Sequence, residues 1–217
     1  MRYDHEYIRN IRQELEKPEL EGSIIASDHG CLSLAIVSDQ QDAERLVAEL
    51  ESQDPDSGWG FREWIEEAML YPGFVVSCRE AADSRAVGFM SFDTLVFIHG
   101  LEGGAGSKAS ISVKLEPKTV YVTEAARGRG PGQAFIDVLA DQVPAVLQRL
   151  AVMSGGSLRD LPVREVTVGM ESECVSEEGA RFIRKAYEAC RRRLAEIARA
   201  GTWKVSSQLS DHIDYGG

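Results

Sequence analysis

Apolar residues recur along this chain at two spacings, and each spacing predicts a different kind of element. A spacing of three and four residues is typical of one face of a helix, whereas strict alternation is typical of a half-buried strand. Helices are predicted at 1–17, after Ser38 or Asp39, from Phe61 to Met69, after Gly130 and after Ser176. Strands are predicted at 31–38, 74–79, 86–97, 110–115, 119–123, 163–170 and 202–209.

The order of these elements predicts the fold class. Strands come first as a group and then alternate with helices, which implies an α/β protein with a mixed sheet and helices on both faces. Two prolines interrupt the pattern: Pro117 separates two predicted strands, and Pro144 predicts a kink or a restart inside the helix after Gly130. The 217 residues suit one domain with an extension. Residues 1–22 are therefore expected to form an N-terminal helical extension, and 23–217 a single domain.

Composition and charge narrow the class of protein. Hydrophobic residues make up 43% and charged residues 27% of the chain, which is typical of a globular domain. The formal net charge of −11 argues against nucleic-acid binding, because duplex binding requires clustered cations. No apolar run approaches ~20 residues, and the first residues lack the apolar stretch of a signal peptide. We therefore expect a cytoplasmic protein that neither spans a membrane nor binds one.

The cysteines and histidines give no sign of a metal site. Four cysteines and four histidines are scattered along the chain, and no two cysteines form a CxxC pair. A zinc site requires clustered ligands, so no metal is predicted. The cysteines are expected to be reduced and mostly packed as small hydrophobic residues.

Two glycine-rich segments are candidates for binding a phosphate group. The first, GAGSKA at 104–109, fits a dinucleotide fingerprint only in its letters. That fingerprint requires a helix directly after the loop, so that free amides point at the pyrophosphate. The residues that follow alternate like a strand and reach Pro117, and no Gly-Lys-Ser/Thr motif is present. This segment is therefore interpreted as a connector.

The second segment, RGRGPG at 127–132, lies between a predicted strand and a long predicted helix. Glycines allow positive φ angles and close approach of a ligand to the backbone. Pro131 suits the first turn of a helix, where its missing N–H costs nothing. Free amides, the helix dipole and two arginines together predict a cradle for a pyrophosphate. The alternatives are a glycine-rich helix start that binds nothing and a loop that binds a nucleotide such as ATP or NAD.

This second segment resembles the coenzyme A signature of the GCN5-related N-acetyltransferase (GNAT) family, R/Q-x-x-G-x-G/A after a central strand. The match lies at Arg127, Gly130 and Gly132, and the order of elements is similar over roughly residues 31–200. The resemblance implies a mostly antiparallel, splayed mixed sheet flanked by helices, with residues 163–170 diverging from the strand before the loop. It also implies acetyl-CoA as co-substrate, bound by Val122, Thr123, Arg127, Gly128, Arg129, Gly130, Gly132 and Gln133.

Catalytic residues follow from the same resemblance. Glu116 lies eleven residues before Arg127, the spacing of the glutamate base in the histone-modifying branch of the family. It shares a face with Lys118, Val120 and Val122 if the strand is regular, and a solvated carboxylate is the other interpretation. Glu124 is an alternative base, whereas Glu171 and Glu173 are candidates for an acidic mouth that attracts a cationic amine.

At the general acid, this sequence departs from the family pattern. The family often places a tyrosine four residues after an alanine early in the last helix, and here Arg184 follows Ala180 at that distance. Tyr187, one turn later, is the candidate acid, and packing in the core is its alternative role.

The predicted function is transfer of an acetyl group from acetyl-CoA to a primary amine in a ternary complex. A non-catalytic module that binds acyl-CoA is the alternative. The expected partners are a small-molecule or peptide amine and, as an open alternative, a second copy of the chain in a homodimer. The acceptor side is expected near Trp59, Phe61 and Trp64, which are apolar and aromatic but not diagnostic.

Overall fold

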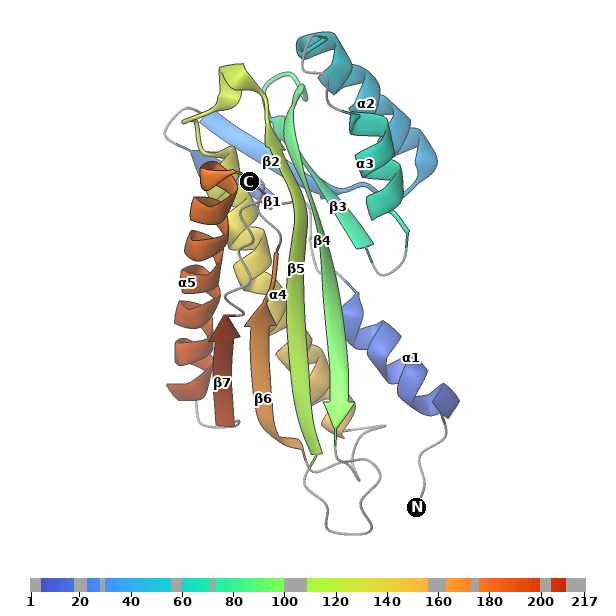
Figure 1. The fold of residues 1–217 in the computed structure, drawn as a ribbon, viewed down its shortest axis with the longest axis vertical. Helices are drawn as coiled ribbons and strands as arrows, with labels where there is room; N and C mark the ends of the chain where they lie inside the picture. Colours follow the sequence, from blue (N-terminus) through green and yellow to red (C-terminus); the bar gives the residue numbers. More distant parts are fainter. Residues whose placement is uncertain are drawn as a thin grey trace. The chain divides into compact units, whose positions relative to one another are not determined.

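The structure is a computed structural model that describes residues 5–17, 23–27, 30–55, 60–70, 73–99, 109–155, 163–172, 176–199 and 204–209. The helices are α1 (His5–Glu16), α2 (Gln40–Gln53), α3 (Phe61–Ala68), α4 (Pro131–Gly155) and α5 (Glu177–Arg199), with a short 3₁₀ turn η1 (Glu124–Ala126). The strands are β1 (Ser23–Ser27), β2 (Gly30–Ile36), β3 (Gly73–Glu80), β4 (Ala86–His99), β5 (Ala109–Val122), β6 (Val163–Met170) and β7 (Lys204–Leu209) (Figure 1).

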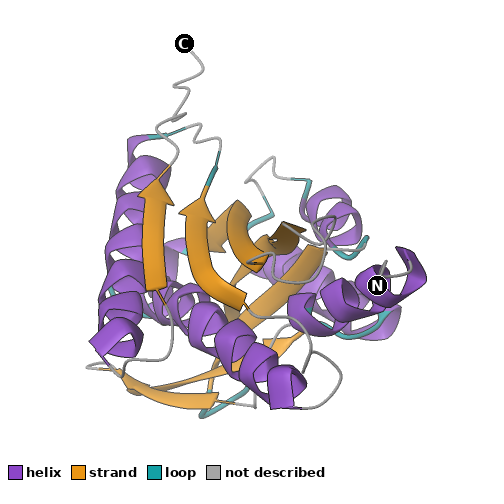
Figure 2. Cartoon of the chain, turned by 90° about the horizontal axis from the view of Figure 1, so that it is seen from below, coloured by secondary structure: helices purple, strands orange, loops and turns teal. Residues whose placement is uncertain are grey.

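These strands form one sheet in the order β1-β2-β3-β4-β5-β6-β7. The pairs β1–β2, β2–β3 and β3–β4 are antiparallel, whereas β5–β6 and β6–β7 are parallel. The β5–β6 ladder ends at Leu115 and Met170, but β5 continues to Val122. The predicted fold class is confirmed: the sheet is mixed and splayed, and helices flank it (Figure 2).

The chain forms two compact units, and β4 and β5 each contribute to both. The first unit comprises Met1–Glu19, Thr94–Glu116 and Leu139–Gly217, and the second comprises Leu20–Asp93 and Pro117–Val138. The division predicted above, an extension at 1–22 and a domain at 23–217, stays a prediction.

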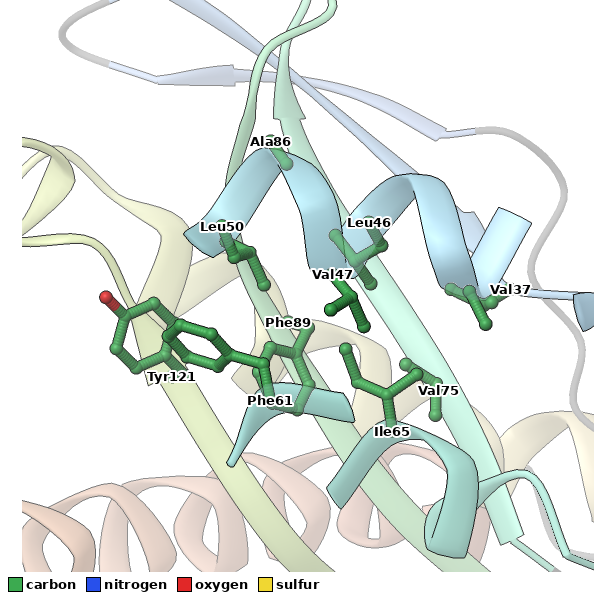
Figure 3. Close-up of a cluster of buried hydrophobic side chains, with 11 residues drawn as sticks. Val37, Leu46, Val47, Leu50, Phe61, Ile65, Val75, Ala86, Phe89 and Tyr121 are labelled. Carbon is green, nitrogen blue, oxygen red and sulfur yellow. The ribbon is translucent and has the colours of Figure 1, made fainter. Parts of the chain in front are cut away.

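The second unit has an aromatic core under α2 and α3. Asp39 caps α2, since its Oδ1 accepts a hydrogen bond from the Asp42 amide (2.8 Å), as the sequence predicts. Phe61, Phe89 and Tyr121 pack together there, with Phe61 and Tyr121 ring centroids 4.8 Å apart (Figure 3). The Tyr121 hydroxyl lies at the edge of this cluster and donates to Asp54 Oδ2 (2.6 Å). Burial and this hydrogen bond raise the pKa of Tyr121.

The first unit is built on alternating burial in β5 and β6. Ile111, Val113 and Leu115 are fully buried, and so are their register partners Val166, Val168 and Met170. The α5 helix begins as predicted, because the Gly179 amide donates to the Ser176 hydroxyl (3.1 Å). Helix α4 continues through Pro144, so the alternative of a restart is wrong.

Helix α1 belongs to the first unit through a buried carboxylate. Ile11 and Leu15 are buried, and Glu16 is only 2% exposed. The Glu16 carboxylate accepts a hydrogen bond from the Val96 amide of β4 (2.9 Å), at a point beyond the last β3–β4 pair, Gly73 with Asp93. The carboxylate therefore takes the place of a missing neighbouring strand for that amide.

Two details of the strands differ from the prediction. Strand β1 has no counterpart in the predicted set, and Pro117 does not separate two strands, since it lies inside the continuous β5. The ladder with β6 ends two residues earlier, at Leu115. Proline lacks the N–H that a central ladder needs, so it is tolerated in this stretch, beyond the end of the β6 ladder.

Strand β5 is also irregular. The Leu115 carbonyl faces β6, since it accepts from the Glu171 amide (3.1 Å), whereas the Thr123 amide faces β4, since it donates to the Val87 carbonyl (3.0 Å). In a regular strand, residues an even number apart point their backbone groups to the same side. The backbone is therefore irregular somewhere between these two points. Side-chain burial nevertheless alternates through the stretch, since Leu115, Pro117 and Tyr121 are buried, and this pattern fits the expected common face of Glu116 with Val120.

Among the described residues, none of the helices combines the length and apolar character that crossing a bilayer requires.

Candidate functional site

The glycine loop between β5 and α4 has the strand–turn–helix geometry expected from the sequence. After η1, the Arg129 amide donates to the Ala126 carbonyl (3.1 Å), and α4 begins at Pro131. Gly128 has φ +76° and Gly130 has φ +108°, backbone conformations that residues other than glycine rarely adopt. These two glycines are therefore required by the turn itself.

The first turn of α4 presents free backbone donors. The first hydrogen bond of the helix is donated by the Ala134 amide to the carbonyl of Gly130, the residue before α4 (3.0 Å). The amides of Gly132 and Gln133, which precede Ala134, have no acceptor among the described residues, as is usual for the first turn of a helix. The Gln133 side chain donates to Asp137 on the same helix (3.0 Å), so only its backbone amide is available to a ligand.

Gly132 differs from the other two glycines of the loop. Its φ is not positive, and a Cβ built on it would meet no atom within 4 Å. Neither the backbone nor the packing of this chain therefore requires glycine there. A glycine in a helix lowers stability by about 0.5–1 kcal/mol relative to alanine. Gly132 therefore has a cost in stability, and it leaves an open space beside the free amides.

The two arginines of the loop are exposed and have different partners. Arg127 Nε donates to the Val122 carbonyl (3.3 Å) and so folds back onto the end of β5. Arg129 lies 3.6 Å from Glu80, whose other oxygen pairs with Arg85 (3.1 Å). Both arginines therefore add positive charge beside the free amides of α4, partly balanced by Glu80.

The strand end that the resemblance assigns to pantetheine offers fewer groups than expected. The Thr123 amide is already bonded to Val87 (3.0 Å), and its carbonyl accepts from Ala126 (3.0 Å). Thr123 is only 4% exposed, and its hydroxyl has no hydrogen-bond partner among the described residues. Val122, one residue earlier, points its backbone groups to the opposite side of the strand. Of the two residues, Val122 is the better candidate to pair with a ligand.

Glu116 lies in an ion cluster at the end of the β5–β6 ladder. The Lys114 ammonium contacts the carboxylates of both Glu116 and Glu171. Glu116 is 15% exposed and Glu171 is 40% exposed. Hydrogen bonds from Glu116 first, and then Glu171, raise the pKa of Lys114. The structure thus brings together Glu116, the candidate base, and Glu171, a candidate for the acidic mouth. Lys114, which joins them, was not predicted from the sequence.

Tyr187 lies on α5 beside the buried stripe of that helix. Ala180, Ile183 and Cys190 are buried, whereas Tyr187 itself is half-buried. Arg184, at the position where the family often has a tyrosine, is exposed. The role of Tyr187 as general acid stays a prediction.

Some candidates fall outside the described residues: Trp59, Glu173, Cys174, His212 and most of the 104–109 segment. Of the other cysteines, Cys78 and Cys190 are buried, as expected, and Cys31 is exposed. Burial raises the pKa of each buried thiol to about 12. Within the parts of the chain that the structure describes, no three His, Cys, Asp or Glu side chains are placed to hold a metal ion.

Comparison with known proteins gave matches among solved structures only. No family model matches the chain, and no curated protein matches it. A ribosomal-protein-alanine N-acetyltransferase from Brucella melitensis biovar Abortus 2308 is similar at 19% identity and TM-score 0.36, over 69% of this chain and 87% of that one. A predicted acetyltransferase with acetyl-CoA from Clostridium acetobutylicum is similar at 12% identity and TM-score 0.37, over 86% and 96%.

A third solved structure is a GNAT family acetyltransferase from Brucella melitensis in complex with acetyl-CoA, at 21% identity and TM-score 0.32, over 52% of this chain and 70% of that one. These neighbours are acetyltransferases. At TM-scores of 0.32 to 0.37, however, the likeness carries no argument about what this chain does. Its function must therefore be inferred from the chemistry of its own loop and ion cluster.

Proposed function

We propose that this chain is an acyl-CoA-dependent N-acyltransferase of the GNAT type, which transfers an acetyl group from acetyl-CoA to a primary amine. The observation that carries the proposal is Gly132. It is a glycine that the chain's own structure does not require, and it leaves an open space beside the free amides of the α4 N-terminus. A pyrophosphate needs close approach to such amides, which a small residue at this position allows and a larger side chain would obstruct.

The residues of the loop divide the binding of coenzyme A among them. The amides of Gly132 and Gln133 and the turn at Gly128 and Gly130 hold the pyrophosphate, with charge from Arg127 and Arg129. The backbone amide of Val122 pairs with the pantetheine arm, since its carbonyl already accepts from Arg127 (3.3 Å), and Thr123 fixes the end of the strand through Val87. Acetyl-CoA supplies an activated thioester carbonyl.

The chemistry at the amine is assigned to two residues. Glu116 accepts a proton from the amine as its nitrogen bonds to the acetyl carbon, directly or through water. The carbon–sulfur bond then breaks, and the Tyr187 hydroxyl supplies the proton that the leaving thiolate takes up. A peptide or small-molecule amine serves equally in this scheme.

Gly132→Glu tests the proposal because it separates stability from binding. The free energy of unfolding should stay unchanged or rise, since glutamate is favoured near the N-terminus of a helix and a Cβ at this position meets no atom of the chain. Acetyl-CoA affinity should fall by about tenfold or more, close to 1.4 kcal/mol, because the side chain fills the space beside the amides and its charge repels phosphate. Gly179→Glu, in the first turn of α5, adds the same side chain at another helix start and should leave affinity unchanged.

Unchanged affinity in a folded Gly132→Glu variant would contradict the assignment of the loop. Turnover is measured separately, as release of free thiol from acetyl-CoA with a panel of primary amines. Tight binding without thiol release for any amine would favour the alternative, a module that binds acyl-CoA without catalysis.

A further inference from the structure

Lys114, near the end of the β5–β6 ladder, contacts carboxylates from two segments that are far apart in the sequence. Its ammonium contacts Glu116 on β5 and Glu171, which follows β6. The side chain of Lys114 is 32% exposed, more than that of Glu116 at 15%. The lysine is therefore the more exposed partner of this ion pair.

The position of this cluster is fixed by the sheet. Leu115 and Met170 form the last pair of the β5–β6 ladder, and the Glu171 amide donates to the Leu115 carbonyl (3.1 Å). Glu116 and Glu171 are thus the first residues beyond the last pair, at the point where β6 ends. Lys114, one residue inside the ladder opposite Gly169, reaches both carboxylates across the end of the sheet.

Few other charged groups share this face in the described part of the unit. Glu165 of β6 lies on it, because its register partner Ser110 alternates with Ser112 and Lys114. On β4, His99 contacts the Ser112 hydroxyl (3.3 Å). From β7 the described contribution is Ser206, which is hydrogen-bonded to Thr167 (3.0 Å). Lys114 is therefore the cation that contacts Glu116 and Glu171, whereas Lys118, farther along β5, pairs with Asp93 (3.6 Å).

Two neighbouring carboxylates cannot both remain ionised easily, because each disfavours the charge of the other. An ammonium between them removes that conflict. The same contacts raise the pKa of Lys114, so its proton is held more tightly in the folded state. The ion pairs therefore contribute to stability at neutral pH and are lost as the pH rises through that raised value.

We propose that Lys114 is a positioning residue that clamps Glu116 and Glu171 together and sets the lower pH limit at which the site works. This inference rests on the proposed function, in which Glu116 accepts the proton of the amine. Lys114 neither gives nor takes that proton. It keeps the Glu116 carboxylate ionised and oriented, so that the carboxylate is free to accept a proton at mildly acidic pH.

Lys114→Met and Lys114→Arg test the clamp through the pH profile of kcat/KM. Methionine removes the charge and keeps the length, so the acidic limb should move up by roughly one pH unit or more. Arginine keeps the charge, so its profile should stay close to that of the wild type. Adding Glu171→Gln to Lys114→Met should reverse most of the shift, because one carboxylate of the pair is gone. Lys118→Met, which also removes a β5 lysine, should not move the limb.

A second readout does not depend on activity. Carbon NMR of the glutamate carboxylates, recorded without acetyl-CoA, should show the cluster taking up its first proton at higher pH in folded Lys114→Met than in the wild type. An unchanged midpoint in a folded variant would overturn the clamp, and so would a lower kcat with an unmoved pH profile. If the wild type released no thiol with any amine, the proposed function would fail while the NMR result would still decide on the clamp.

Discussion

The glycine loop, which follows β5 in the sequence, and the ion cluster of Lys114, Glu116 and Glu171 are built in opposite ways. The loop offers backbone amides from consecutive residues, at Gly132 and Gln133. The cluster offers side chains that only the sheet brings together, since Lys114 and Glu116 come from β5 and Glu171 follows β6. One site depends on local conformation and the other on the register of two strands.

This difference has consequences for how each site responds to substitution. A backbone site fails when a side chain fills its space or repels the ligand, or when a residue cannot adopt the φ angle of the turn. A side-chain cluster fails when a charge is removed, because the remaining partners are left uncompensated. The predictions below use these two kinds of failure to separate the loop from the cluster.

The largest effect outside the loop is expected for Glu116→Gln. If Glu116 takes the proton of the amine, kcat should fall by about 10²–10⁴-fold, the usual contribution of a positioned base, while acetyl-CoA affinity stays the same. The defect should shrink at higher pH, where more of the amine is already neutral. Steady-state kinetics across the pH range, with calorimetric titration of acetyl-CoA, measures both quantities.

Glu165→Gln is the matched control for that variant, since it removes a carboxylate from the same face of the sheet. Its kcat should remain near that of the wild type. Full activity of Glu116→Gln would show that solvent carries the proton, and that catalysis depends on proximity and oxyanion stabilisation alone.

A smaller effect is expected for Arg127→Ala, which probes the loop through its charge. Acetyl-CoA affinity should fall by about 1–3 kcal/mol, the range for a hydrogen bond to a charged group. Calorimetry measures it, with Arg45→Ala on α2 as the control for loss of one exposed arginine. An equally large loss of acetyl-CoA affinity in Arg45→Ala would mean that binding depends only on the overall charge of the protein.

Local signals in the sequence were enough to predict most elements and the loop. The Asp39 and Ser176 caps, the strand at 163–170 and the glycine turn before Pro131 all depend on residues within one turn or strand. The loop could be predicted for the same reason, because its donors are backbone groups placed by three nearby glycines.

The rest depends on contacts that spacing along the chain does not reveal. Lys114 reads as one polar position in an alternating strand, and its link to Glu171 follows only from the parallel register of β5 and β6. Pro117 predicts a strand break by local rules, yet the strand continues because the β6 ladder ends two residues before it. Strand β1 is five residues long and is defined by its pairing with β2.

The central claim, that the loop at 127–133 holds the pyrophosphate of acetyl-CoA, is tested most directly by calorimetric titration of Gly130→Asp. Gly130 has φ +108°, which strains any other residue, and a carboxylate there repels phosphate. The account predicts near-complete loss of acetyl-CoA binding in the folded variant, with unchanged binding in Gly104→Ala and Gly106→Ala. Wild-type affinity in folded Gly130→Asp, or a large loss in the two variants of the other glycine segment, would contradict it.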